Sequence, residues 1–346
     1  MIKYLKNSHK ALFTEYPITT DVFEPYRFHQ TLPAYKQTPL VPLNNYARKN
    51  GIGELYVKDE SNRFGLNSFK ALGASFAVSR LPQKPELLVS CTDGNHGQGL
   101  AWYGSTINVP VRIFMPKGSD ERRVAKIRKY GAEVVVSDFN YDDTVRYAAR
   151  WAKEHGGTLV QDTAFDDYRE IPSYIQTGYS TLIIEAVKQL GKDPTHVFLQ
   201  AGVGTFAGGA IRALSEICRK MPYIGIIEAE TCDCFYQSFL KEETVKIGGS
   251  PYTIMAGLNC GEPSILVLPV FQKYADWFIS VSDDVSLRGM RLSRDPVEGD
   301  PVFNGGESGA VGLGVVDEII EKGLKEEFMM NDDSVILVIN TEGKLV

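Results

Sequence analysis

The stretch KDESNRFGLNSFKALG, residues 58–73, decides which fold the sequence predicts. It follows a short apolar run, passes through a Gly/Asn loop and enters a helix. The apolar positions of this helix recur at helical spacing, namely Phe69, Leu72 and Phe76. We expect Ser68 to be the N-cap, which places Lys70 in the first helical turn. Because the positive end of the helix dipole disfavours another positive charge, Lys70 is pushed towards the neutral amine that imine chemistry requires.

Lys70 on its own has a simpler interpretation, since most lysines are exposed and an ordinary surface helix would carry one. The surrounding sequence favours a functional role. SFKALGA, residues 68–74, resembles the segment that carries the cofactor lysine in the fold type II pyridoxal-phosphate enzymes, the superfamily of tryptophan synthase β and threonine dehydratase. The longer segment from Lys58 is similar to one branch of that superfamily, the diaminopropionate ammonia-lyases.

Composition excludes several other classes of protein. The chain has 346 residues, with 43% hydrophobic and 23% charged residues, which is typical of a globular protein large enough for two domains. A net charge of −6 gives no basic excess for nucleic acid or an anionic membrane. We expect no membrane span, no signal peptide and no metal site, and therefore a cytoplasmic protein. Of the five cysteines, Cys232 and Cys234 alternate, and plain thiols are favoured over a disulfide or redox pair.

Beyond residue 75, short β-branched runs alternate with helical patterns, which predicts parallel sheets with crossover helices. The expected strands are Leu87–Cys91, Val111–Met115, Val134–Val136, Thr158–Val160, Thr195–Gln200, Tyr223–Ala229, Trp277–Val281 and Val335–Asn340. The expected helices are His96–Ser105, Asp120–Tyr130, Asp142–Lys153, Ile171–Gln189, Ala207–Lys220, Val285–Ser293 and Gly309–Lys322. Residues 1–54 are expected to be an irregular arm and a proline-rich connection.

The fold expected from this pattern and from the resemblance is a two-domain α/β fold type II enzyme with parallel-rich open sheets covered by helices. Residues 76–177 would form a smaller domain inserted into a larger, cofactor-binding one made of residues 1–75 and 178–346. These borders rest mainly on the resemblance.

A glycine-rich loop, AGVGTFAGGA at residues 201–210, lies between an expected strand and an expected helix. Glycines allow close backbone approach, and the amides of a helix N-terminus form an anion site, so a phosphate is the leading candidate ligand. The loop also fits the loose dinucleotide fingerprint, with Glu228 and Glu230 ending the next strand, and a purely structural turn is a third possibility. Its distance from Lys70 matches the phosphate loop of fold type II enzymes, which favours pyridoxal phosphate over NAD. The cofactor contacts that this implies are Gly202, Val203, Gly204, Thr205 and Gly208.

A second loop, CTDGNHGQG at residues 91–99, resembles the Ser/Thr-x-Gly-Asn-His loop that holds the substrate carboxylate in the superfamily. The resemblance assigns Thr92, Gly94 and neighbouring amides to the substrate, and Asn95 to the phenolic oxygen of the cofactor. His96 is placed with the substrate-binding residues, although a helix-start residue bonded to backbone is its preferred interpretation. Asp93 departs from the small hydroxyl residue usual at its position.

A carboxylate at Asp93 would repel an ordinary amino acid's carboxylate, but it suits a substrate with an additional cation. An N-cap is the alternative role for this residue. Asp162, in the segment QDTAF, occupies the position of an active-site aspartate in the resembling ammonia-lyases. Thr341, in INTEG, resembles the hydroxyl residue that faces the pyridine nitrogen, and a neutral hydroxyl stabilises a protonated ring less than a carboxylate would.

The activity that the resemblance implies is elimination from 2,3-diaminopropionate, of one or both enantiomers, to pyruvate and two ammonia molecules. Lys70, Asp93 and Asp162 are the expected catalytic residues, and a homodimer is the expected assembly. A serine or threonine dehydratase and a non-catalytic cofactor-binding protein remain alternatives. The connection between Lys70 and Asp93 is shorter than expected for the ammonia-lyases, which leaves the exact substrate open.

Overall fold

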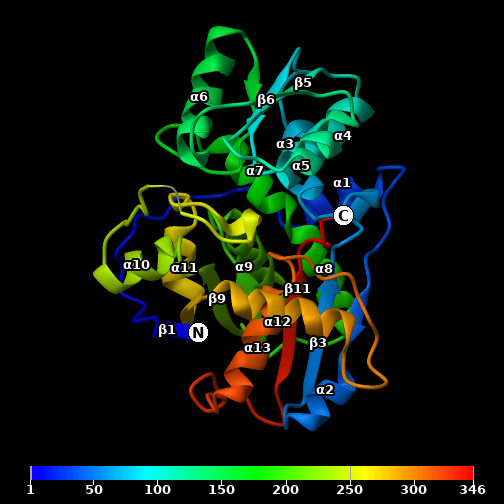
Figure 1. The fold of residues 1–346 in the computed structure, drawn as a ribbon, viewed down its shortest axis with the longest axis vertical. Coiled ribbons are helices and arrows are strands. Elements are labelled where there is room, and N and C mark those ends of the chain that lie inside the picture. Colours follow the sequence, from blue (N-terminus) through cyan, green and yellow to red (C-terminus); the bar gives the residue numbers. More distant parts are fainter. Residues whose placement is uncertain (1, 250, 346) are drawn as a thin grey trace.

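The computed structural model describes residues 2–249 and 251–345, which form two separate β-sheets flanked by helices (Figure 1). The strands are β1 (Ile2–Lys6), β2 (Leu40–Pro42), β3 (Glu54–Asp59), β4 (Leu88–Cys91), β5 (Val111–Met115), β6 (Glu133–Val136), β7 (Thr158–Leu159), β8 (His196–Gln200), β9 (Tyr223–Ala229), β10 (Trp277–Val281) and β11 (Val335–Asn340). The expected α/β fold with parallel-rich sheets is therefore confirmed.

The larger sheet has the strand order β1-β10-β9-β8-β11-β3-β2. Its five central strands are parallel, and only the edge strands β1 and β2 run antiparallel to their neighbours. Every residue of β8, β10 and β11 is buried, as expected for strands covered by helices on both faces. Because parallel strands end at the same side of a sheet, the residues that follow β8 and β11 meet at one edge.

The smaller sheet has the order β6-β5-β4-β7, and all its pairs are parallel. It lies between residues 88 and 159, inside the interval expected for the smaller domain, whose exact borders remain a prediction. In Figure 1 this sheet and helices α4, α5 and α6 occupy the upper part of the molecule, above the larger sheet.

The helices follow the expected alternation with strands. They are α1 (Phe23–Gln30), α2 (Asn44–Lys49), α3 (Ala71–Ser79), α4 (Asn95–Thr106), α5 (Glu121–Arg128), α6 (Tyr141–Glu154), α7 (Glu170–Gly178), α8 (Ser180–Leu190), α9 (Thr205–Ile217), α10 (Cys234–Lys241), α11 (Leu268–Tyr274), α12 (Asp283–Arg294) and α13 (Val311–Glu321), with short 3₁₀ turns at Arg63–Gly65 and Ala256–Leu258. None of the helices in the described ranges has both the length and the hydropathy needed to cross a bilayer.

Two expectations about the elements are wrong. Residues 2–54 are not irregular throughout, because β1, α1, β2 and α2 lie within them. Pro42 is accommodated because β2 is an edge strand, where a missing backbone donor costs little. The single helix expected at Ile171–Gln189 is two helices, separated at Tyr179. At that break the backbone of Gly178 lies against Gly73, where a Cβ atom would come within 2.8 Å of the Gly73 Cα.

The lysine segment is held in place by buried ion pairs. Lys58 and Arg63, at its start, are fully buried, and both bind the carboxylate of Glu185 in α8, at 2.7 and 2.8 Å. Arg63 also binds Glu60 at 2.6 Å. Removing one partner of such a network leaves an uncompensated buried charge, which typically costs about 3–5 kcal/mol. The segment before Lys70 is therefore rigidly attached to the larger sheet and its helices.

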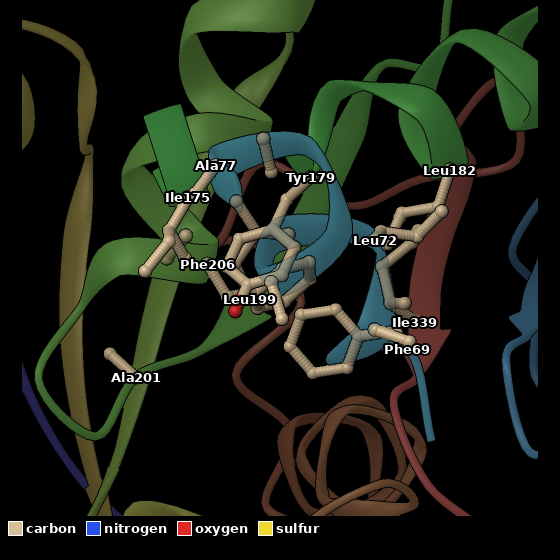
Figure 2. Close-up of a cluster of buried hydrophobic side chains, with 14 of the residues drawn as sticks. Phe69, Leu72, Ala77, Ile175, Tyr179, Leu182, Leu199, Ala201, Phe206 and Ile339 are labelled. Carbon is tan, nitrogen blue, oxygen red and sulfur yellow. The ribbon is translucent and has the colours of Figure 1, made fainter. Parts of the chain in front are cut away.

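A single hydrophobic cluster continues from the lysine segment to both sheets. Figure 2 shows part of it, with Phe69, Tyr179 and Phe206 close together. The ring of Phe69 lies 4.7 Å from that of Tyr179 and 4.8 Å from that of Phe206, at centroid distances typical of tilted aromatic pairs. This packing fixes the residue beside Lys70 against α9 and the junction of α7 and α8. The backbone that carries Lys70 is therefore held in place by this packing.

Candidate active site

One cleft collects most of the residues predicted to be functional. It contains about 690 Å³ of empty space, including its open mouth, and lies where β4, β8 and β11 end. The predicted residues that line it are Lys70, Thr92, Asp93, Asn95, His96, Asp162, Gly202, Val203, Gly204, Thr205 and Thr341. Gly94 and Gly208 are not among the lining residues.

Lys70 reaches into this cleft from the N-terminus of α3 and donates a hydrogen bond of 2.7 Å to Oδ2 of Asp162. Burial alone would lower the pKa of Lys70, but the charge of Asp162 outweighs it and raises the pKa. Burial would likewise raise the pKa of Asp162, and the charge of Lys70 brings it below its usual value. The expectation of a neutral amine is wrong for this arrangement, because an adjacent carboxylate is stronger than the helix dipole.

The expected N-cap is also corrected. The N-cap position of α3 is Lys70 itself, and no side chain caps this helix. Ser68 instead pairs through its backbone with Glu342, next to the end of β11. The amide of Phe69 donates to the carbonyl of Thr341 at 3.1 Å. The lysine segment is thus attached to the strand end that carries Thr341.

The loop at residues 91–99 is organised by the hydroxyl of Thr92, which accepts hydrogen bonds from the amides of Gly94 and Gly97 at 2.9 and 3.1 Å. Gly94 has φ of 142°, and a Cβ there would lie 3.1 Å from the side chain of Arg123. Its amide is used inside the loop, which argues against the expected direct substrate contact. His96 is buried and its Nε2 lies 2.7 Å from the carbonyl oxygen of Val160, which agrees with the structural interpretation preferred for it.

Asp93 lines the cleft without capping α4, because Gly94 holds the N-cap position and no side chain caps this helix. The alternative N-cap role is therefore wrong. Burial raises the pKa of Asp93 to about 7, with Arg123 opposing the shift and Asp162 adding to it. A carboxyl group of this kind can hold or accept a proton near neutral pH.

The glycine-rich loop runs from the end of β8 to the start of α9 and lines the cleft as expected, up to Phe206. Gly204 has φ of 87°, and a Cβ there would lie 2.5 Å from the ring of Phe235. Gly204 is therefore required by its backbone conformation and by the protein behind it. A Cβ at Gly208 would stand 3.0 Å from Nε2 of Gln176 in α7, and the cofactor contact expected of Gly208 stays a prediction.

Several lining residues were not predicted from the sequence, among them the polar residues Arg123, Gln200 and Glu342. The carboxylate of Glu342 accepts hydrogen bonds from Nδ2 of Asn95 and from the amide of Ser308, the latter at 3.0 Å. The one signal for Glu342 in the sequence was its position beside Thr341 in the segment INTEG. Arg123 lies in the first turn of α5, and nothing in the sequence linked that helix to the loop at residues 91–99.

The donors and acceptors of the cleft suit pyridoxal phosphate. Lys70 offers a primary amine, the glycine-rich loop leads into the N-terminus of α9, and Thr341 offers a hydroxyl. A helix N-terminus approached through glycines is suited to a phosphate group, and a lysine amine forms an imine with an aldehyde. Within the described ranges, no three His, Cys, Asp or Glu side chains are grouped so that they could hold a metal ion, and the cysteines are free thiols.

Comparisons with known proteins indicate the same cofactor. The family described as "Pyridoxal-phosphate dependent enzyme" matches residues 31–341. Diaminopropionate ammonia-lyase of Escherichia coli K12 is 43% identical over 345 residues, covering 92% of this chain and 87% of the relative. The Salmonella typhimurium protein of the same name is 39% identical, covering 91% and 87%.

A solved structure of the E. coli ammonia-lyase, in complex with an aminoacrylate–PLP azomethine reaction intermediate, superposes with a TM-score of 0.92. It is 39% identical and the match covers 100% of this chain and 94% of that one. By the family match and by these identities and coverages, the chain belongs to the pyridoxal-phosphate-dependent enzymes and, within them, to the diaminopropionate ammonia-lyases.

Proposed function

We propose that this protein converts 2,3-diaminopropionate and water into pyruvate and two ammonia molecules. The observation that carries the proposal is the presence of two carboxylates, Asp93 and Asp162, in one cleft with Lys70. An ordinary amino acid offers this cleft one ammonium group and one carboxylate. Diaminopropionate has a second ammonium group at its β-carbon. This group supplies the positive charge that would pair with the second carboxylate of the cleft.

The bound cofactor supplies an electron sink for breaking bonds at the carbon that carries the amino group. Lys70 would hold the cofactor and, once released by the substrate amine, take up the proton from that carbon. Asp162, 2.7 Å from Nζ, keeps the amine in place and stabilises its protonated form. This pairing would stabilise the proton that Lys70 takes up.

Asp93 differs from Asp162 because the described residues provide no ion pair for it, although Arg123 acts on it electrostatically. A pKa of about 7 lets its carboxyl group contact the β-ammonium group when ionised and accept a proton when a base is needed. If it lies on the side of the cofactor opposite Lys70, it would serve as the base for the D-enantiomer. We propose these roles for Asp93 in addition to that of Lys70.

The remaining predicted contacts fit the same placement of the cofactor. Val203 and Thr205 would bind the phosphate together with Gly202 and Gly204, while Asn95, oriented by Glu342, would lie near the phenolic oxygen. Thr92 belongs to the carboxylate loop. These assignments are supported by the shared cleft.

A serine or threonine dehydratase is the second candidate, because such an enzyme would use the same lysine and phosphate loop. Its substrates lack the second cation, and the unpaired Asp93 argues against them. Ammonia and pyruvate released from a panel of β-substituted amino acids separate the candidates. We expect two ammonia molecules per pyruvate from diaminopropionate; faster release from serine or threonine would favour the dehydratase, and no release from any substrate would favour a binding protein without turnover.

The homodimer and the cytoplasmic location implied by the resemblance stay predictions. Sedimentation velocity of the cofactor-loaded protein tests the first, with a monomer as the contradicting result. Fractionation of the source cells tests the second.

A further inference from the structure

Gln200 is the last residue of β8 and lies beneath the cleft, with 3% of its surface exposed. Its Nε2 atom is surrounded by four oxygen atoms. They are the carbonyl oxygens of Ser308, Gly309 and Ile339, at 2.9, 3.3 and 3.0 Å, and Oγ1 of Thr341, at 3.0 Å. Neither the glycine-rich loop nor the INTEG segment indicates a role for this side chain.

These neighbours fix which end of the Gln200 amide is which. A backbone carbonyl can only accept a hydrogen bond, so the atom among three carbonyls must be the amide nitrogen. Turning the amide over would place Oε1 against three backbone carbonyl oxygens. None of these four oxygen atoms could donate a hydrogen bond to another. The orientation of the amide is therefore set by the backbone around it.

The fixed amide determines what the hydroxyl of Thr341 can do. An amide nitrogen has no lone pair to offer, so Thr341 can only accept from Gln200 and cannot donate to it. Across residues 2–249 and 251–345, no acceptor takes the proton of this hydroxyl within hydrogen-bond distance, and Thr341 lines the cleft. The hydroxyl thus presents its proton to whatever occupies the cleft.

The position of this donor relative to Lys70 is also fixed. The carbonyl of Thr341 accepts from the amide of Phe69, the residue before Lys70, at 3.1 Å. Gln200 bonds to Ile339 and Thr341, on both sides of the last residue of β11. The lysine that would hold the cofactor and the hydroxyl of Thr341 therefore belong to one hydrogen-bonded unit.

We propose that Gln200 is a positioning residue, which makes the Thr341 hydroxyl an obligatory hydrogen-bond donor to the ring nitrogen of the cofactor. A ring nitrogen that accepts a hydrogen bond carries no proton of its own. Gln200 would thereby select the unprotonated ring through Thr341. The inference depends on the cofactor placement given under the proposed function, and it is independent of which amino acid is the substrate.

One atom of Gln200 would suit the opposite arrangement, in which the ring nitrogen carries a proton. Oε1 of Gln200 is buried and has no hydrogen-bond partner in the described ranges. A protonated ring nitrogen could donate to this oxygen, and Gln200 would then act directly on a protonated ring. The two arrangements place the ring proton differently, so that one measurement distinguishes them.

That measurement is nitrogen-15 NMR of the holoenzyme reconstituted with pyridoxal phosphate labelled at the ring nitrogen. The inference predicts the chemical shift of an unprotonated, hydrogen-bonded nitrogen in the wild-type protein and in Thr341→Ser. In Thr341→Val the shift should move to that of a nitrogen without a donor. A protonated ring nitrogen in the wild-type protein would overturn the proposal.

The role of Gln200 itself is tested by Gln200→Leu, with Gln176→Leu as the matched control at another buried glutamine. Gln200→Leu removes Nε2 and leaves the Thr341 hydroxyl free to turn its proton away from the cleft, so the ring resonance should move towards that of Thr341→Val. Gln176 faces α9, and its replacement should leave the ring resonance unchanged. An unchanged resonance in a Gln200→Leu protein that folds and binds cofactor would contradict the positioning role.

Cofactor affinity provides a second readout through a double-mutant cycle. Gln200→Leu and Thr341→Val should each weaken pyridoxal phosphate binding by about tenfold, the loss expected for one hydrogen bond. The double variant should bind no more weakly than Thr341→Val, because Gln200 acts through the hydroxyl. If the losses of the two single variants multiply in the double variant, Gln200 acts independently of Thr341 and its role is merely structural. Should the proposed elimination fail for every substrate, both readouts still decide this inference, because neither needs turnover.

Discussion

The amine of Lys70 lies 2.7 Å from the carboxylate of Asp162, in a cleft lined by residues that follow strands of both sheets. Lys70 belongs to the segment held by the larger sheet, and Asp162 follows β7 of the smaller one. The ion pair thus joins the two sheets at the reacting position. It also gives both residues a structural role that the sequence did not suggest.

Replacing Lys70 by Ala should abolish covalent attachment of the cofactor and turnover. It should also lower the free energy of unfolding. Asp162, with 4% of its side chain exposed, would lose the charge that keeps its pKa low. Its pKa would then rise above the unfolded value, so stability would fall as pH increases and the carboxylate ionises. We expect a loss of about 3 kcal/mol at pH 8 and a smaller one at pH 5, measured by urea unfolding.

The double variant Lys70→Ala, Asp162→Asn is the control, because it removes both charges. It should recover most of the lost stability without recovering cofactor attachment. Equal losses at both pH values, with no recovery, would show that the ion pair does not stabilise the fold. A borohydride-reduced cofactor adduct on another lysine would overturn the role of Lys70.

Asp93→Asn should stabilise the folded protein above about pH 7 while impairing catalysis. The pKa of Asp93 is raised to about 7, so in the wild-type protein stability is lost as pH rises from the unfolded value through the folded one. The asparagine has no such cost. The difference in Tm between variant and wild type should therefore grow from pH 4 to pH 8, and a constant difference would contradict the raised pKa.

Asp93→Asn and Asp162→Asn should differ in their effect on the two enantiomers of diaminopropionate. Asp93→Asn should impair the D-enantiomer more than the L-enantiomer, because Lys70 still takes the proton from the latter. Asp162→Asn should impair both. Losses of about 10²–10⁴-fold in kcat/KM are expected where a general base is removed. Equal losses of both enantiomers in both variants would leave Asp93 without a stereospecific role.

Arg123→Gln should move the pH dependence without removing activity. The charge of Arg123 opposes the rise in the pKa of Asp93, so its removal should raise that pKa above about 7. The limb of the kcat/KM profile that reports the ionisation of Asp93 should shift to higher pH. Arg122→Gln, on the neighbouring exposed position of α5, should leave the profile in place.

Gly204→Val should destabilise the protein whether or not the cofactor is present. The residue has φ of 87°, and a side chain would meet Phe235 and Val267. A loss of about 2 kcal/mol or more is expected for a bulky residue at a strained position. Gly248→Ala, in open space, is the control and should be neutral. A stable Gly204→Val protein with weakened cofactor binding alone would instead support a glycine required only by the phosphate.

The sequence predicted the elements whose signal is local. The β-branched runs predicted β4 to β11 to within a residue or two, and the segments around Lys70, Asp93, Asp162 and Thr341 converge on one cleft. Edge strands such as β1 were missed, because their pairing is with a partner far along the chain. The same reason hid Glu185, which receives Lys58 and Arg63, and Gln200, which orients Thr341.

The preference between diaminopropionate and L-serine tests the central claim, that two carboxylates select a substrate with a second cation. The measurement is the ratio of kcat/KM for the two substrates in the wild-type protein, Asp93→Asn and Asp162→Asn. The wild type should prefer diaminopropionate, and each variant should lower the ratio by about tenfold or more, as expected for loss of a charged contact. Small and equal effects on both substrates would contradict the claim and return the protein to the dehydratases.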